Sequence, residues 1–177
     1  MQNLIPKQEE EEKRLKALAE YRILGTKPES CYDDITKIAA STCDVPISLM
    51  TLVDRDKQWF KSKVGLEIQE TPRDWSFCTH AIKENSPLII NDAFQDERFI
   101  NNPLVTNDPK IRFYAGFPLR NRDGNKLGTL CVIDRKPGNL SPKQFNVMEL
   151  LSKQIVSFLE LRKKSLNLLD ALSTLHK

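Results

Sequence analysis

The last quarter of the chain shows one continuous helical periodicity, and the length of that helix limits how the rest can fold. The helix is predicted to start at Ser141, a capping residue followed by Pro142 at the first helical position. From Met148 onward, apolar residues recur every three or four positions almost to the C-terminus. About 35 residues at 1.5 Å each span about 50 Å. That is longer than a domain of 177 residues can cover.

We therefore predict that the distal part of this helix pairs with a second copy of the chain, as a homodimer. An arginine within the apolar stripe would weaken the pairing but help to fix its register. The alternative is a solvated helix end without a partner. The predicted dimer contact consists of Ile155, Leu159, Arg162, Leu166, Leu169 and Leu172.

Two further helices are predicted near the start of the chain. Residues 9–24 carry a helical stripe that ends at Gly25, and residues 30–43 carry a second one. The predicted organisation is a flexible acidic N-terminus at residues 1–11, one domain body at 12–140 and the C-terminal helix at 141–177.

The middle of the chain is predicted to contain five β-strands. Residues 57–64 alternate with the period of two that is typical of a half-exposed strand. A short helix is expected near residues 76–83, and the polar connection at 92–113 has a length typical of a binding or covering element. This order predicts an α+β fold with helices packed on one face of an antiparallel sheet. The strands are expected at residues 46–54, 57–65, 88–92, 114–121 and 126–134.

Charge and hydropathy exclude several classes of protein. The formal net charge is +3, and the basic excess lies after residue 140, so the body has no basic stripe for a nucleic-acid partner. No segment reaches the ~18 apolar residues of a membrane span. The N-terminus is acidic and polar, whereas a secretory signal is basic and then apolar. We expect a cytoplasmic protein with no membrane partner.

Several spaced motifs together resemble a known family. The chain from about residue 12 to 160 is similar to bacterial GAF domains of the type found as input modules of sensor histidine kinases and diguanylate cyclases. No kinase or cyclase output motif follows these segments. The motifs are YRILGT at 21–26, PISLMTLVDRDKQWFKSKVGL at 46–66, ETPRDWSFCTHAI at 70–82, DERFINNPLV at 96–105, IRFYAGFPL at 111–119 and GTLCVID at 128–134.

The resemblance implies a regulatory fold with a central antiparallel sheet and helices packed around it. It also implies a small-molecule pocket between one sheet face and the segments near residues 73–83 and 92–113. It does not name the ligand, so the cofactor is unknown. The candidate pocket residues are Trp75, Phe77, Cys78, His80, Asp92, Phe99, Arg112, Phe113, Tyr114, Thr129 and Cys131.

Cys78 and His80 are the first candidates for chemistry. Residues i and i+2 of a helix point about 200° apart, so this spacing does not create a thiol–imidazole pair. Bilin-binding relatives attach their chromophore through a cysteine, often with an adjacent histidine, and the intervening Thr79 departs from that pattern. A covalent chromophore is therefore not expected. The chain has no CxxC pair and only two histidines, so no metal site is expected either.

Two charged groups in the body leave alternatives open. Asp92, Asp96, Glu97 and Arg98 cluster in one loop, where a pair of carboxylates could act as general acid and base or the acidic residues could simply cap a helix. Arg112, beside two aromatic residues, could bind a planar or anionic ligand or pair with a local acid such as Asp108. The terminal His176 lacks the following glutamate of kinase phosphoacceptor helices, so no such role is predicted.

The sequence thus predicts a non-enzymatic sensory domain that binds a small molecule and signals through a dimeric C-terminal helix. Two alternatives stay open. One is a thiol-dependent reductase on the same fold that uses Cys78 or Cys131, and the other is a ligand-free dimerisation scaffold.

Overall fold

Six strands form a single sheet in the computed structural model, which describes residues 5–175 of the chain. The spatial order is β3-β2-β1-β6-β5-β4, and all neighbouring strands are antiparallel. The long strands are rich in β-branched and aromatic residues, which favour a pleated and buried surface. The strands are β1 (Ile47–Val53), β2 (Lys57–Val64), β3 (Glu70–Pro72), β4 (Leu88–Ile90), β5 (Phe113–Arg120) and β6 (Lys126–Asp134).

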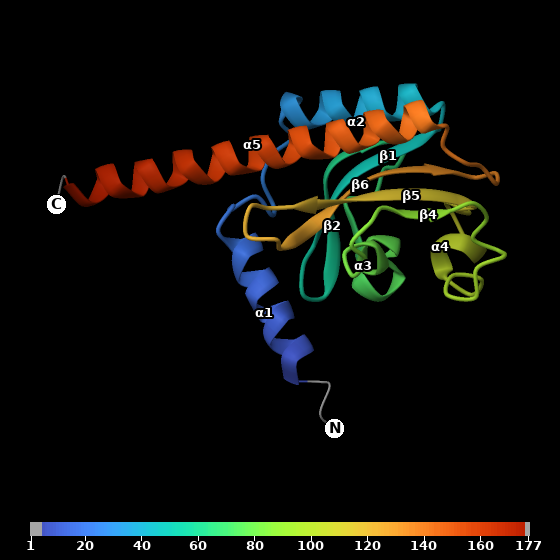
Figure 1. Cartoon of the computed structure of the whole chain (residues 1–177), viewed down its shortest axis with the longest axis horizontal. Helices are drawn as coiled ribbons and strands as arrows, with labels where there is room; N and C mark the ends of the chain where they lie inside the picture. Colours follow the sequence, from blue (N-terminus) through green and yellow to red (C-terminus); the bar gives the residue numbers. More distant parts are fainter. Residues whose placement is uncertain (1–4, 176–177) are drawn as a thin grey trace.

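Helices cover both faces of this sheet, which confirms the fold that the resemblance implies, whereas the one-face arrangement inferred from the order of elements is wrong. The long helices α2 and α5 lie side by side on one face, and α3 and α4 lie on the other (Figure 1). The sequence pattern did not reveal the second layer because its helices are only four or five residues long. The helices are α1 (Ile5–Ala19), α2 (Ser30–Cys43), the 3₁₀ turn η1 (Arg73–Trp75), α3 (Phe77–Ala81), α4 (Pro103–Thr106) and α5 (Pro142–Leu175).

Alternation along the strands divides the core into two halves. Phe113 of β5 packs with α2 and α5, whereas the next residue, Tyr114, packs with α3 and α4. This follows from the period of two in a strand, which sends successive side chains to opposite faces. Since both faces are covered, strand β1 is buried along its whole length.

Strand β2 differs from its prediction, because it is not half exposed. A β-bulge interrupts its pairing with β1: Met50 pairs with Ser62 and Thr51 pairs with Phe60, which leaves Lys61 unpaired. As a result, Lys61 and Ser62 both contact the α2 side, where their polar atoms bond to other side chains. The residues from Gln58 to Ser62 are therefore all buried.

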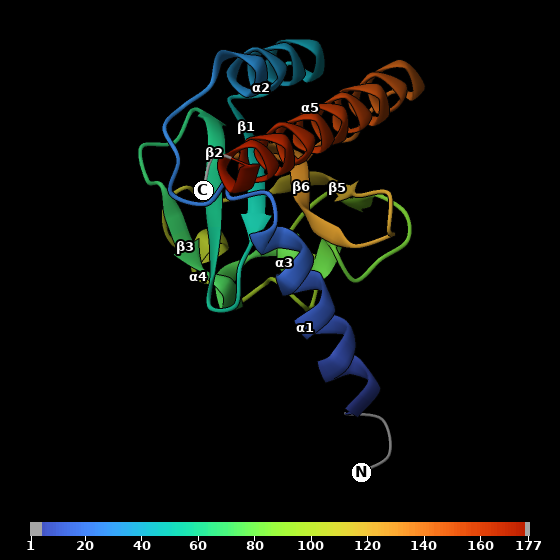
Figure 2. The same cartoon turned by 90° about the vertical axis from the view of Figure 1, so that its left-hand side faces the viewer.

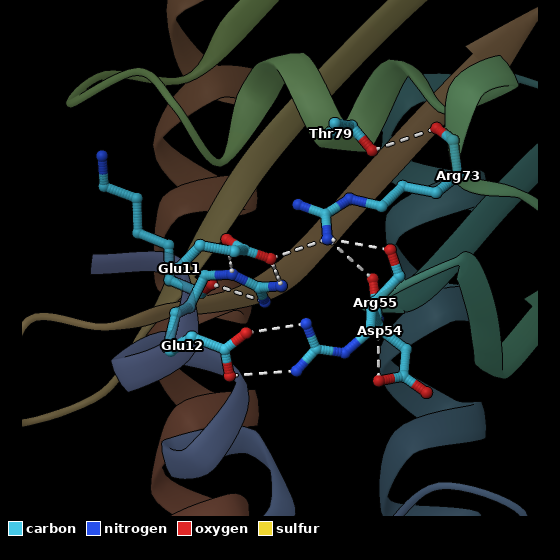
Figure 3. A network of polar contacts seen from close by, with 8 residues as sticks. Glu11, Glu12, Asp54, Arg55, Arg73 and Thr79 are labelled. Atoms are coloured by element: carbon cyan, nitrogen blue, oxygen red, sulfur yellow. Dashed lines mark hydrogen bonds and ion pairs between the residues drawn. The ribbon is translucent and has the colours of Figure 1, made fainter. Parts of the chain in front are cut away.

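The N-terminal segment is helical from Ile5, so the predicted flexible terminus at residues 1–11 is wrong for its described part. Glu12 of α1 pairs with Arg55 of the β1–β2 hairpin, and Glu11 pairs with Arg14 and with Arg73 of η1 (Figure 3). These contacts hold the helix against the body. The helix ends at Ala19, five residues before its predicted end at 24.

Tertiary contacts explain why α1 ends early. Tyr21 is fully buried, and its hydroxyl donates a 2.7 Å hydrogen bond to Glu160 of α5. The next residue, Arg22, has a φ of 44°, in the left-handed region, so the chain leaves the helix and continues towards α2. We call residues 20–29, between α1 and α2, the linker.

Helix α5 is continuous, as predicted, and extends beyond the sheet (Figures 1 and 2). The predicted dimer stripe, however, partly faces the domain itself. Ile155 and Leu159 are fully buried in the core, Arg162 is hydrogen-bonded to the linker, and Leu166 is half buried. Helical periodicity does not tell which stripe covers the chain's own core. Leu169 and Leu172 of the predicted stripe are exposed, and other exposed leucines of α5 lie outside it: Leu150, Leu161, Leu168 and Leu175.

Candidate functional site

The face of the sheet under α3 and α4 encloses a small apolar cavity. Its walls come from β1, β2, β5 and β6, from α3 and α4, and from the segments that follow β2 and α4. The cavity has a volume of about 20 Å³, which is room for about one water molecule. A cavity therefore lies on the face of the sheet where the resemblance implies a pocket, and side chains leave it little free space.

Four of the predicted pocket residues line this cavity: Phe77, Cys78, Tyr114 and Cys131. Phe99 lies directly behind them, because its ring stacks on Phe77 with centroids 4.0 Å apart and an angle of 8° between the planes. His80 packs edge-on against Phe99 at 4.9 Å. Phe99 and His80 thus lie behind the cavity wall that Phe77 forms and do not line the cavity themselves.

The remaining predicted residues lie elsewhere, apart from Thr129, which contacts Cys78. Phe113 belongs to the core on the opposite face of the sheet, and Trp75 is 40% exposed at the end of η1. Arg112 does not pair with Asp108. Its guanidinium donates two hydrogen bonds to Asp92, of 2.8 and 2.9 Å, and lies over the Phe94 ring at 4.5 Å from the centroid.

The Asp92–Arg112 pair thus has a local explanation. It ties the loop after β4 to the start of β5, and the hydrogen bonds from Arg112 lower the pKa of the Asp92 carboxyl. Asp96 forms a comparable pair with Arg98. Neither carboxylate faces the cavity, so the structure does not assemble the acid–base pair that the sequence left open.

Cys78 is the polar centre of the cavity wall. Its thiol sulfur accepts hydrogen bonds from Thr129 Oγ1 at 3.1 Å and from the Tyr114 hydroxyl at 3.3 Å. Thr129 is in turn 3.1 Å from Thr51 Oγ1. Desolvation raises the pKa of the Cys78 thiol. Hydrogen bonds from Cys131, Thr129, Thr51 and Tyr114 have a larger, opposite effect and lower this pKa to about 6. The cavity therefore contains a buried sulfur whose anionic form is stabilised.

Cys131 has the opposite environment. Desolvation and its contact with Cys78 hold the pKa of the Cys131 thiol well above its usual range. Cys78 accepts the hydrogen bonds of Thr129 and Tyr114, so the two thiols have different surroundings. Both are buried, at 2% exposure for Cys78 and 0% for Cys131.

A polar chain fixes the position of α3. Ser76 caps the helix by accepting from Thr79 N, and its hydroxyl donates to Gln58 Oε1 at 2.7 Å. The amide nitrogen of Gln58 then donates to Thr71 Oγ1 at 2.7 Å. Gln58 and Thr71 also line the cavity, and the sequence did not single them out.

The other lining residues that were missed are apolar, and three of them lie in the polar connection at residues 92–113. A signal for them existed, because isolated apolar residues in a long polar connection have to be buried somewhere. Phe99 and Phe113, in the same connection, were predicted instead, and neither lines the cavity. The missed residues are Leu49, Phe60, Leu66, Ile68, Leu104, Pro109, Ile111 and Ile133.

The described part of the chain contains neither a metal-ligand cluster nor a membrane-spanning helix. Within residues 5–175, no group of three or more histidine, cysteine, aspartate or glutamate residues could hold a metal ion. No helix there is both long and apolar enough to cross a membrane. His176 lies outside the described residues.

The six-stranded antiparallel sheet, the small α3–α4 layer and the long C-terminal helix together form an α+β domain. The family model for the GAF domain matches residues 27–158, and the chain belongs to that family. The cyclic di-GMP phosphodiesterase PA2567 of Pseudomonas aeruginosa is 37% identical over 153 residues, which is 86% of this chain. The match covers 26% of that protein, so the chain spans about a quarter of its length.

Solved structures agree on the fold. The GAF domain from the Acinetobacter phosphoenolpyruvate-protein phosphotransferase superposes with a TM-score of 0.61 at 16% identity, covering 88% of this chain and 96% of that one. The free methionine-R-sulfoxide reductase from Neisseria meningitidis, solved in complex with its substrate, superposes with a TM-score of 0.62 at 13% identity. That match covers 82% of this chain and 87% of the reductase. At such identities the likeness concerns the fold alone.

Proposed function

We propose that this chain is a regulatory GAF module that pairs with a second copy through the distal half of α5. The observation that carries the proposal is the exposed leucine face of that helix. The side chains of Leu161, Leu168 and Leu175 are 62%, 62% and 80% exposed, respectively. Apolar surface of this kind on a helix outside its own core favours burial against another helix.

The spacing of these leucines fits a coiled coil. Positions 161, 168 and 175 are seven residues apart, and Leu172 lies between the last two in the alternating three-and-four pattern of a heptad. At about 100° per residue they lie within about 60° of one another, on the side of α5 opposite Ile155 and Leu159. The helix can therefore bind its own domain with one face and a partner with the other.

The oligomeric state of single-site variants tests this pairing. In size-exclusion chromatography with light scattering, we expect a dimer for the wild type and a monomer for Leu168→Glu. Asn167→Glu is the matched control, because it adds the same charge to an exposed neighbour outside the leucine face. A monomeric wild type, or a dimer that survives Leu168→Glu, would contradict the proposal.

The proposal includes a small-molecule ligand for the face under α3 and α4. The mostly apolar lining with a few convergent polar groups, Cys78, Gln58 and Tyr114, supports such a site. Because the cavity holds only about one water, binding requires α4 and the adjoining segments to move outward. Movement of this layer would alter packing on the sheet, and α5 lies on the opposite face.

Mass spectrometry on protein purified without added ligand distinguishes the ligand sensor from a scaffold. An extra mass under native conditions that is lost on denaturation supports a non-covalent ligand. Retention of that mass after denaturation would instead indicate covalent attachment. A ligand-free dimer would favour the scaffold.

A location in the cytoplasm belongs to the same proposal, and the four free cysteines support it.

A thiol-dependent reductase is the second candidate, and the hydrogen-bonded Cys78 sulfur is the observation that favours it. Burial argues against it, since a substrate cannot reach a sulfur that is 2% exposed without the cavity opening. The rate of thiol alkylation in native protein at neutral pH distinguishes a catalytic Cys78 from a buried structural one. A catalytic Cys78 would react at least as fast as the half-buried Cys31, and we expect it to react more slowly.

A further inference from the structure

A second and larger cleft lies between α1, the turn of the β5–β6 hairpin and the end of α3. Its volume is about 540 Å³, within the usual range of small-molecule sites. It shares no lining residue with the cavity under α4. The proposed dimer and the α4 site do not involve it.

The described residues that line this cleft are mostly charged, and basic side chains outnumber acidic ones. Five basic residues face two acidic ones, although the net charge of the whole chain is only +3. Ile82 is the one apolar side chain among the described lining residues, and no aromatic ring is present there. Such a surface fits a polar anion and offers no aromatic side chain for a nucleobase to stack on. The basic residues are Lys7, Arg14, Arg73, Lys83 and Lys126.

The carboxylate of Glu11 lies between two of these basic residues, Arg14 and Arg73. Arg14 donates to both oxygens of Glu11, at 2.8 and 2.7 Å, and Arg73 donates to Glu11 Oε1 at 2.6 Å (Figure 3). Burial raises the pKa of the Glu11 carboxyl, but the hydrogen bonds and charges of the two arginines lower it more strongly, to about 2. Two guanidinium groups from different elements are therefore arranged around one anionic group.

The arginines are held in place independently of Glu11. Arg73 NH1 also donates to the carbonyl oxygens of Asp54 and Arg55, at 3.0 and 3.2 Å, and Arg14 NH1 donates to the carbonyl of Lys126 at 3.4 Å. Within residues 5–175, the Nε and NH2 groups of Arg73 have no hydrogen-bond partner, and Figure 3 shows one of these nitrogens without a contact to the residues drawn. A guanidinium presents such donors in the planar geometry that suits phosphate.

We propose that this cleft binds a small phosphorylated metabolite without an aromatic ring, such as a sugar phosphate. Its phosphate group takes the place of the Glu11 carboxylate between Arg14 and Arg73, and Lys83 at the rim adds a further positive charge. The polar remainder of the metabolite lies along Asn125 and the hairpin turn. Because Glu11 belongs to α1, binding loosens one attachment of that helix while the Glu12–Arg55 pair stays intact.

Calorimetry with ribose 5-phosphate, and with ribose as the uncharged control, tests the proposal on the full chain. We expect the phosphate ester to bind and ribose not to bind. Arg73→Gln should weaken the binding about tenfold or more, the loss expected for one charge-assisted hydrogen bond. Glu11→Gln should tighten it several-fold by removing the competing carboxylate, a gain that a damaged fold could not produce.

Arg55→Gln is the matched control, because Arg55 pairs with Glu12 beside the cleft and does not line it. It removes the same charge and should leave the affinity unchanged. Equal affinity for ribose and ribose 5-phosphate would overturn the proposal, as would an affinity that neither Arg73→Gln nor Glu11→Gln changes. An equal loss with Arg55→Gln would also overturn it, because binding would then follow net charge alone. None of these outcomes bears on dimerisation through α5.

Discussion

Arg162 Nε donates a 2.8 Å hydrogen bond to the main-chain carbonyl of Tyr21, which ties α5 to the linker at the point where the helix leaves the domain. The same guanidinium donates to the carbonyl of Arg22 at 2.9 Å and to Glu29 Oε1 at 3.2 Å. Three contacts from one side chain thus fix the direction of the projecting half of α5. Periodicity placed Arg162 in the predicted dimer contact, but in the structure its guanidinium bonds to the linker of the same chain.

Replacing this arginine should loosen the projecting helix. We expect Arg162→Met to lower the free energy of unfolding by about 1–3 kcal/mol, because three carbonyl and carboxylate groups lose a charged donor. Amide hydrogen exchange in residues 160–170 should become faster. The control is Asp170→Asn, which removes the exposed Arg22–Asp170 pair and should cost less than about 1 kcal/mol. Unchanged exchange in Arg162→Met would show that the linker does not hold α5.

Removing Glu29 from its ion pair with the buried Lys61 should cost more stability than removing Lys61. The Lys61 side chain is 0% exposed and that of Glu29 is 37% exposed, at a distance of 2.6 Å. Glu29→Gln leaves a buried ammonium without its counter-charge, so we expect a loss of about 3 kcal/mol in urea unfolding. Lys61→Met should cost less, because Glu29 keeps Arg162 and solvent. The double variant should be more stable than Glu29→Gln alone, and strict additivity of the two losses would contradict this account.

Gly128 of β6 should tolerate no side chain. A Cβ atom there would lie 1.9 Å from the Thr51 carbonyl oxygen and 2.8 Å from Leu52 Cα, both on the neighbouring strand. We expect Gly128→Ala to cost about 3 kcal/mol or more in unfolding free energy, because a central strand has to shift. Gly124→Ala is the control, since its φ of +83° is unfavourable for alanine but nothing lies within 4 Å. It should cost about 1 kcal/mol, and equal losses would contradict the steric explanation.

The Cys78 thiol should make stability depend on pH. Its pKa is about 6 in the folded protein, and a free thiol has a pKa of about 8.5. Between these values the unfolded state binds more protons, so folding becomes more favourable as the pH rises. We expect the stability of the wild type relative to Cys78→Ala to increase from pH 6 to pH 8.5 and to be constant below pH 6, measured by urea unfolding under reducing conditions.

Thr129→Val gives an independent check of the same thiol. It removes one hydrogen bond to the Cys78 sulfur, so it should raise the Cys78 pKa and move the stability gain to higher pH. Thiolate absorbance during a pH titration measures the pKa directly. A pH profile that is the same in the wild type and Thr129→Val would show that this hydroxyl does not stabilise the thiolate.

Local patterns in the chain were sufficient to predict most of the long elements. The helix at 30–43, the strands that meet at Asp54–Asp56 and Asn121–Asn125, and the C-terminal helix all have the predicted type. Turn residues and periodicity act over a few positions and need no distant partner. Short elements such as β3 and α4 were missed, because three or four residues carry too little periodicity to distinguish them from a loop.

The site was predicted less well, for a physical reason that Phe113 and Tyr114 illustrate. They are adjacent aromatic residues in the sequence, but the alternation of side chains along β5 sends only Tyr114 to Cys78. Arg112 was recognised as a charged candidate, but its partner Asp92 lies twenty residues away and is brought near by the pairing of β4 with β5.

The sequence by itself determined the family, the antiparallel α+β class and the length of α5, because motifs, alternation and helical periodicity are properties of consecutive residues. Only the tertiary structure decided which leucines of α5 are exposed, that the cavity is closed, and that Glu11 lies between Arg14 and Arg73. Each of these depends on side chains from segments far apart in the sequence. Their packing is set by the core as a whole, through the bulge at Lys61 and the bonds of the linker to α5.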